Sequence, residues 1–159
     1  MATHEDIHVE LNADPKLLRA VRGLVRGYLE SWSFPEDRVL EVVLAVDEAC
    51  TNAMRHAYNN EPGNRLALRL RSAETCIEIE LRDEGQPAPT GRVKRKKIVV
   101  PDKETLQPGG LGVQILYEVF DQVQFAPGPD RGNRVTMRLN KRDGESPRSP
   151  VDRRSRTET

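Results

Sequence analysis

The sequence predicts an α/β protein, a two-layer α/β sandwich in which helices lie on one face of a mixed, mostly antiparallel sheet. Two observations support this fold class. Apolar residues recur at every second position in the shorter segments and at helical spacing in the longer ones. The segments also follow the order strand, helix, helix, strand, strand, long loop, helix, strand, strand, which provides enough helices to cover one face of a single sheet.

Length and composition indicate one globular domain. The chain has 159 residues, and its 25 basic and 25 acidic side chains balance, so no overall charge favours nucleic acid or a membrane. We expect residues 1–140 to form the domain and residues 141–159, which are polar, to be a disordered tail. No run of ~18 apolar residues occurs and the N-terminus does not resemble a signal peptide, so we expect a cytoplasmic protein with reduced cysteines.

The first strand and the first helix are predicted from residues near the N-terminus. Residues 7–11 alternate between apolar and polar side chains, as in a strand with one buried face. Asp14 is a typical N-cap, and Pro15 suits the first position of a helix. The apolar stripe that follows continues at helical spacing to Trp32 and is expected to face the core.

A second helix, over residues 39–58, carries the first candidate site residues. Its polar side presents Glu48 and Asn52, which are four residues apart and therefore stand one above the other. A carboxylate that can take a proton then lies beside an amide oxygen that can bind a hard cation. The alternative is the ordinary solvated face of an amphipathic helix. The side expected to pack consists of Val39, Val42, Val43, Val46, Cys50, Ala53 and Ala57.

Two strands follow, over residues 66–70 and 75–83. In the second strand the alternation that turns its apolar residues inward also points Asp83 inward, while Glu80 points outward. An inward carboxylate costs several kcal/mol unless buried donors satisfy it or it lines a cavity that admits a ligand. Gly85, two residues later, lets a backbone or a ligand approach closely. The alternative is that Asp83 is an ordinary turn residue that ends the strand.

A long loop, residues 86–108, separates these strands from the last helix. Loops of this length are usually lids, binding loops or disordered inserts. Five of the six residues 92–97 are basic, which is either a solvated run or a local attraction for phosphate. Gly109, Gly110, Leu111 and Gly112 then open a helix, where free amides and the helix dipole favour an anion. Strands at residues 122–125 and 134–139 close the sheet.

Three segments in this order carry a family resemblance. EACTNAMRHAY, DEGQP and GGLGVQIL resemble the three nucleotide-binding boxes of the GHKL ATPase superfamily, whose ATP-binding fold is of the Bergerat type. The short region between the second and third boxes and the small size of the chain most resemble the anti-sigma-factor serine kinases of that superfamily. The resemblance covers roughly residues 7 to 140.

The resemblance implies a role for each matching position. Glu48 matches the general base that accepts the proton of an attacking serine, and Asn52 matches the Mg²⁺ ligand. Asp83 matches the carboxylate that accepts the adenine amino group. Arg55 is expected to support the phosphates, and His56 to pack. The remaining matches are Gly85 under the adenine and Gly109, Gly110, Leu111 and Gly112 around the phosphates.

Two positions depart from the family pattern. DEGQP lacks the second glycine of the wider superfamily. Asn133, after Gly132, stands where a threonine usually shares a water with adenine and the aspartate. Because an asparagine side chain can still hydrogen-bond that water, Asn133 stays among the predicted ATP-binding residues. The basic run at residues 92–97 has no counterpart in the family pattern.

The resemblance implies an ATP- and Mg²⁺-dependent protein serine kinase. It would phosphorylate an anti-anti-sigma protein of the STAS type, sequester a sigma factor and form a homodimer, without contacting nucleic acid directly. The alternative is a partner-switching module that binds nucleotide without turnover, but such a module has no chemical need for Glu48. The catalytic domain of a sensor histidine kinase is disfavoured, because no room remains for a dimerisation helix that bears a phospho-accepting histidine.

Overall fold

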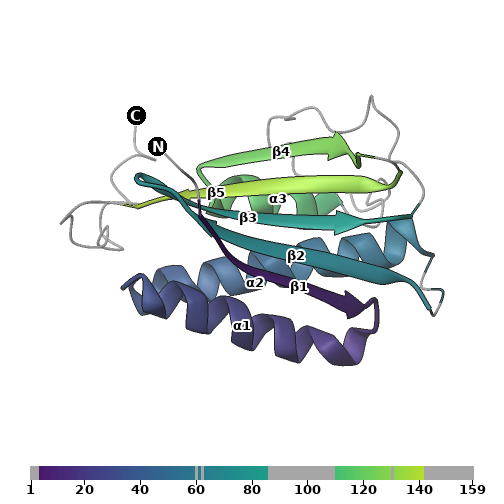
Figure 1. Cartoon of the computed structure of the whole chain (residues 1–159), viewed down its shortest axis with the longest axis horizontal. Helices are drawn as coiled ribbons and strands as arrows, with labels where there is room; N and C mark the ends of the chain where they lie inside the picture. The colour runs from purple at the N-terminus through teal and green to yellow at the C-terminus, as the bar shows by residue number, and fades with distance from the viewer. Residues whose placement is uncertain (1–3, 60, 62, 86–109, 130, 142–159) are drawn as a thin grey trace, which may run out of the picture.

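One antiparallel sheet forms the first layer of the structure. The computed structural model describes residues 4–59, 61, 63–85, 110–129 and 131–141. Its five-stranded sheet has the order β1-β2-β3-β5-β4 (Figure 1). The strands are β1 (His4–Asn12), β2 (Arg65–Ser72), β3 (Cys76–Asp83), β4 (Gln122–Pro127) and β5 (Asn133–Asn140).

The sheet is more regular than the mixed, mostly antiparallel sheet that the sequence predicts. Every neighbouring pair of described strands is antiparallel. β3 and β4 run in the same direction, but β5 lies between them and pairs with both. Strands that run in the same direction are therefore never neighbours in the described sheet.

The helices form the second layer, on one face of the sheet (Figure 1). α2 packs between α1 and α3. No helix in the described ranges is both long enough and apolar enough to span a membrane. The helical segments are the 3₁₀ turn η1 (Pro15–Leu17), α1 (Leu18–Ser31), α2 (Glu36–Asn52), the π-helical turn η2 (Ala53–Ala57) and α3 (Gly110–Val119).

The start of the first helical segment confirms the predicted cap. The side chain of Asp14 accepts a hydrogen bond from the backbone N–H of Lys16 at 2.9 Å, and Pro15 occupies the first position. α2 begins at Glu36, three residues before the predicted start at Val39. Glu36 and Asp37 lie in its first turn, where negative side chains stabilise the positive end of the helix dipole.

The core lies between the two layers. The inward residues of β2 and β3 are buried, as their alternation predicts, and they pack against α1, α2 and α3. Cys50 and Cys76 are both free thiols, which confirms the expectation of reduced cysteines. The largest fully buried side chains include Leu29, Leu66, Leu68, Leu70, Ile77, Ile79, Leu116, Met137 and Leu139.

The outer face of the sheet buries one charged side chain. Glu80 points outward but is only 3% exposed. Arg71 forms an ion pair with it at 3.2 Å, and the guanidinium of Arg82 also binds it. The two arginine side chains therefore cover Glu80, in place of a second layer.

The chain is fastened to the sheet just after β5. The backbone N–H of Lys141 donates to the carbonyl of Thr75 at 2.8 Å, and its ammonium donates to the carbonyl of Ala73 at 2.7 Å. The same ammonium lies 3.8 Å from the centre of the Trp32 ring. Lys141 is the first residue of the predicted tail, and residues 142–159 lie outside the described ranges.

Candidate functional site

The last turns of α2 present the first two candidate residues. Glu48 and Asn52 are both half-buried, and four helical residues separate them by about 6 Å along the axis. No described residue forms a hydrogen bond or an ion pair with the Glu48 carboxylate. The Oδ1 atom of Asn52 is buried and accepts no hydrogen bond from the described residues. A buried acceptor without a donor is costly, so Asn52 fits the role of a cation ligand.

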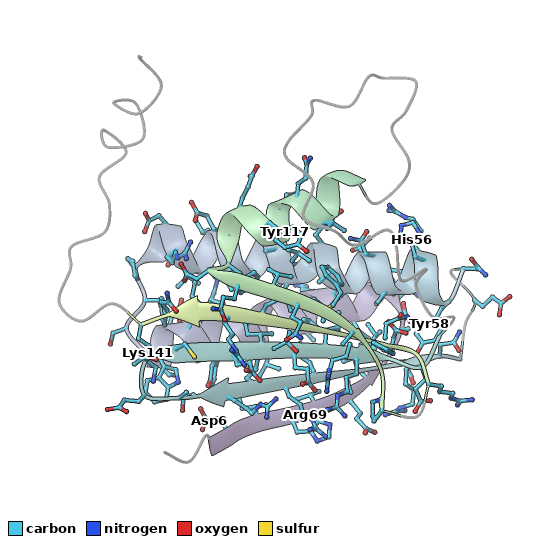
Figure 2. The ribbon with its side chains drawn as sticks, turned by 90° about the horizontal axis from the view of Figure 1, so that it is seen from above. Asp6, His56, Tyr58, Arg69, Tyr117 and Lys141 are labelled. Atoms are coloured by element: carbon cyan, nitrogen blue, oxygen red, sulfur yellow. The ribbon has the colours of Figure 1, made fainter. Side chains whose placement is uncertain are left out.

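A π-helical turn follows Asn52 directly and was not foreseen. We predicted one regular helix over residues 39–58, but the α-helix ends at Asn52 and η2 continues it. Met54 and Tyr58 are buried in the core, whereas Arg55 and His56 are exposed. The expectation that His56 packs is therefore wrong, because His56 follows Asn52 by four residues and lies on the same polar side of the segment. Figure 2 shows His56 at the outer edge of this segment.

Asp83 ends β3 with its carboxylate turned inward. Its side chain lies in the core face and the residue is 8% exposed, which confirms the predicted orientation. The backbone N–H of Gly85 and the Nδ2 of Asn133 both donate to its Oδ1, at 3.0 Å each. Burial raises the pKa of Asp83 above its ordinary value, and these hydrogen bonds oppose that rise. Of the two predicted alternatives for an inward carboxylate, buried donors or a cavity that admits a ligand, the structure shows the donors.

Gly132 brings β5 into unusually close contact with the end of β3. Asn133 is the register partner of Asp83. The preceding Gly132 has a φ of +79°, and a Cβ at this position would lie 2.0 Å from the carbonyl oxygen of Asp83. Only glycine tolerates both conditions. The family pattern places Asn133 in the site but gives no role to Gly132, although a glycine just before the first residue of a strand is a usable signal.

Tyr58 connects the helical segment to the end of β3. Its hydroxyl accepts a hydrogen bond from the backbone N–H of Glu84 and donates one to the carbonyl of Arg65, both at 2.6 Å. Tyr58 is not among the site residues that the sequence predicts, although it ends the EACTNAMRHAY segment. Figure 1 shows that the end of α2, the end of β3 and the start of α3 lie at the same end of the molecule.

The glycine-rich segment is only partly described. Gly110, Leu111 and Gly112 are the first residues of α3, so this segment does open a helix as predicted. Gly109 and the basic run at residues 92–97 lie outside the described ranges. The part that these residues play in binding an anion stays a prediction.

One hollow of the described surface lies apart from these residues. It measures about 500 Å³ and is lined by residues of α3, β4 and β5, among them Tyr117 and Thr136. It contains none of the predicted site residues. The chemistry gathered around Asp83 and Asn52 therefore makes the better candidate site.

The chain is similar in sequence to bacterial proteins of known name. The chain is similar to the serine-protein kinase RsbW of Bacillus velezensis, with 28% identity over 144 residues that make up 88% of this chain and 90% of the relative. It is also similar to the anti-sigma F factor of Oceanobacillus iheyensis, with 31% identity over 101 residues, or 64% of this chain and 68% of the relative.

A solved structure and a family model complete the comparison. The structure of the RsbU and RsbW domains of a Mycobacterium tuberculosis protein matches with a TM-score of 0.54 at 14% identity, over 87% of this chain and 32% of the solved chain. That similarity supports the two-layer fold alone. The model of the histidine kinase-like ATPase domain matches residues 11–139, and an ATPase domain implies that ATP is bound. This chain therefore belongs to the histidine kinase-like ATPase domain family, within the GHKL superfamily.

Proposed function

We propose that this protein is an ATP-dependent protein serine kinase that also acts as an anti-sigma factor. It would phosphorylate a STAS-type antagonist and sequester a sigma factor in the other state of the switch. The names of its relatives, serine-protein kinase and anti-sigma F factor, support this proposal. The observation that carries it is that three groups lie at one end of the fold. They are the carboxylate of Glu48, which has no partner among the described residues, the unsatisfied Oδ1 of Asn52 and the buried Asp83.

Glu48 is proposed as the general base. A base must lie within reach of the serine hydroxyl and must not be held by another group. Glu48 is half-buried on α2, and no described residue pairs with it. Its carboxylate can therefore accept the proton of a serine hydroxyl as that oxygen bonds to the γ-phosphorus of ATP and ADP leaves. Phosphoryl transfer otherwise depends mainly on positioning and on neutralising charge.

Asp83 is proposed to recognise the adenine base. The two donors at its Oδ1, from Gly85 and Asn133, fix the plane of the carboxylate. The second oxygen, Oδ2, is proposed to accept a hydrogen bond from the adenine amino group. Asn133 stands where the family pattern has threonine, and its amide holds Asp83 directly. Gly85 would leave room for the flat base above the backbone.

Asn52 is proposed to bind Mg²⁺ through Oδ1. The described residues contain no cluster of three or more His, Cys, Asp or Glu side chains that could hold a metal. Mg²⁺ would therefore share its ligands between Asn52, the ATP phosphates and water, which is its common arrangement in kinases. Bound Mg²⁺ would supply positive charge to the phosphates. Arg55, exposed in η2, and the opening of α3, with Gly110, Leu111 and Gly112, are proposed to contact the phosphates.

The remaining parts of the proposal concern the chain as a whole. Residues 1–140 would form the catalytic domain and residues 141–159 a polar tail, in a cytoplasmic homodimer. The partners would be a sigma factor and its STAS-type antagonist, and the balanced charge of the chain favours proteins over nucleic acid.

Phosphotransfer by the Glu48→Ala variant tests the proposal. Radiolabelled ATP, Mg²⁺ and a STAS-domain antagonist from the same organism are incubated with the wild type and the variant. We expect the variant to transfer phosphate about 10²- to 10⁴-fold more slowly, because the base is lost. Titration calorimetry should show nearly unchanged Mg-ATP binding, since Glu48 is not proposed to hold the nucleotide. Equal transfer rates would exclude Glu48 as the base, and a wild type that binds ATP but labels no protein would favour the module without turnover.

A further inference from the structure

The hydroxyl of Tyr58 joins three separate segments of the fold. The ring is buried and only 6% exposed at the end of η2. Its oxygen accepts from the N–H of Glu84, after β3, and donates to the carbonyl of Arg65, which begins β2. A phenol has one donor proton and acceptor lone pairs, so both kinds of bonding capacity are used.

These contacts lie between the two halves of the proposed nucleotide site. Asn52, the proposed metal ligand, immediately precedes η2, and Tyr58 immediately follows it. Glu84 lies between Asp83 and Gly85, the proposed adenine-binding residues. A tyrosine side chain has only two rotatable χ angles and is therefore a stiff connector. Its position consequently sets the distance between the helix that carries Asn52 and the turn that carries Asp83.

The hydroxyl is available as a donor throughout the neutral pH range. Burial is the main cause that raises the pKa of Tyr58 above its ordinary value of 10.0, and the neighbouring charge of Asp83 adds to the rise. The proton that reaches Arg65 is therefore retained near pH 7. A phenylalanine ring would fill the same space in the core, but it could make neither of the two hydrogen bonds.

We propose that Tyr58 is a positioning residue for adenine recognition, because its hydroxyl holds the turn from Asp83 to Gly85 in register with the helix that bears Asn52. This inference rests on the proposed function, in which ATP binds between these elements. Adenine presents an amino group where guanine presents a carbonyl oxygen, so a displaced Asp83 weakens ATP more than GTP. The phosphate contacts are common to both nucleotides.

The test compares two tyrosine variants of the full chain. Tyr58→Phe removes one oxygen from the proposed connector. Tyr28→Phe removes the same atom from a buried tyrosine whose hydroxyl donates to Asp6, also at 2.6 Å. Asp6 and Tyr58 lie toward opposite ends of the sheet in Figure 2, so the control makes the same chemical change away from the site. Mg-ATP and Mg-GTP binding is measured by titration calorimetry, together with thermal unfolding.

We expect Tyr58→Phe to raise the Kd for Mg-ATP about tenfold and the Kd for Mg-GTP by no more than about twofold. Tyr28→Phe should lose comparable thermal stability and keep both Kd values. If the wild type binds no Mg-ATP, the proposed function fails and the inference fails with it. If the wild type binds but Tyr58→Phe loses no affinity, or loses it equally for both nucleotides, only the inference is overturned.

A second measurement needs no variant and covers the case in which Tyr58→Phe does not fold. Amide hydrogen exchange of the wild type is followed at Glu84 with and without Mg-ATP. We expect the Glu84 N–H, held by Tyr58, to be protected in the free protein and to exchange about tenfold more slowly with Mg-ATP. An unprotected Glu84 N–H in the nucleotide complex would overturn the role of Tyr58.

Discussion

At the scale of single residues, Asp83 is a carboxylate buried at the end of a strand. Removing it from water disfavours its charged form, and two hydrogen bonds to Oδ1 compensate only in part, so its pKa is raised. Such an arrangement is unfavourable for folding alone. It becomes useful if the second carboxylate oxygen accepts a donor from a ligand.

The pH dependence of Asp83→Asn tests this environment. Because the folded pKa is above the ordinary value of 3.8, protonation favours the folded state. The stabilising contribution is complete below that value and is lost as the pH rises through the folded pKa. Relative to Asp83→Asn, which does not titrate here, the wild type should therefore become more stable as the pH falls from 7 toward 4. Urea unfolding at several pH values measures the difference.

Asp83→Asn should also bind Mg-ATP about 10- to 100-fold more weakly than the wild type, because an amide replaces a charged acceptor. The asparagine oxygen can still accept from Gly85 and Asn133, so the fold should be retained. A stability difference that does not change with pH would contradict the raised pKa. Unchanged ATP affinity would contradict the proposed contact with adenine.

Asn52 is the second residue whose chemistry is not explained by folding. Its Oδ1 accepts no hydrogen bond from the described residues, so Asn52→Ala should change the stability of the free protein by less than about 1 kcal/mol. We expect the Mg²⁺ dependence of ATP binding to be lost. At a concentration of about 100 Kd, Mg-ATP should stabilise the wild type by about 2.7 kcal/mol, and the variant far less. Thermal unfolding with ATP, with and without Mg²⁺, measures both effects.

Thr51→Ala is a matched control for that experiment. Thr51 precedes Asn52 on α2, and its hydroxyl donates to the carbonyl of Asp47 at 2.9 Å within the helix. This control should keep the Mg²⁺-dependent stabilisation. If Asn52→Ala and Thr51→Ala respond alike to Mg-ATP, Asn52 is not the metal ligand.

At the scale of elements, the contact between the start of β5 and the end of β3 determines where Asp83 lies. Gly132 has a positive φ, and a Cβ at this position would collide with the carbonyl of Asp83 and the Cα of Glu84. Any side chain at this position has to displace the backbone that carries the proposed adenine contact. A substitution at Gly132 would therefore displace Asp83 directly.

Gly132→Ala should consequently cost about 2–4 kcal/mol of stability and also weaken ATP binding. Gly63→Ala is the matched control, because Gly63 also has a positive φ, of +89°, but a Cβ there meets no atom within 4 Å. The control should cost only about 1–2 kcal/mol, which is the backbone strain alone. Denaturant unfolding compares the two variants. Equal losses in the free energy of unfolding would show that β5 does not approach β3 closely at Gly132.

The π turn η2 is the second element that matters for the site. A regular helix would have continued the row of residues that includes Asn52 in one direction. Through η2, Met54 and Tyr58 stay buried while Arg55 stays exposed. Arg55 is thereby free to reach a bound phosphate, while Tyr58 reaches the backbone beside Asp83.

At the scale of the whole molecule, the sandwich brings together segments that are far apart in the chain. The antiparallel register places Asp83 opposite both Leu66 and Asn133. α2 crosses the same sheet and ends near this edge, where α3 begins (Figure 1). The apolar core holds the layers at a fixed separation, so the polar groups at this end keep their relative positions without a direct bond between Asn52 and Asp83.

The sequence by itself determined the order of the elements, the inward direction of Asp83, the cap at Asp14 and the family. These follow from local rules, since alternation, helical spacing and capping depend on near neighbours in the chain. Tertiary structure alone decided the π turn, the burial of Glu80 and the close approach of Gly132. The close approach of Gly132 and the cover of Glu80 by Arg71 depend on contacts with other strands. The hydroxyl of Tyr58, bonded to Arg65 at the start of β2 and to Glu84 just after β3, likewise depends on how these segments are placed in space.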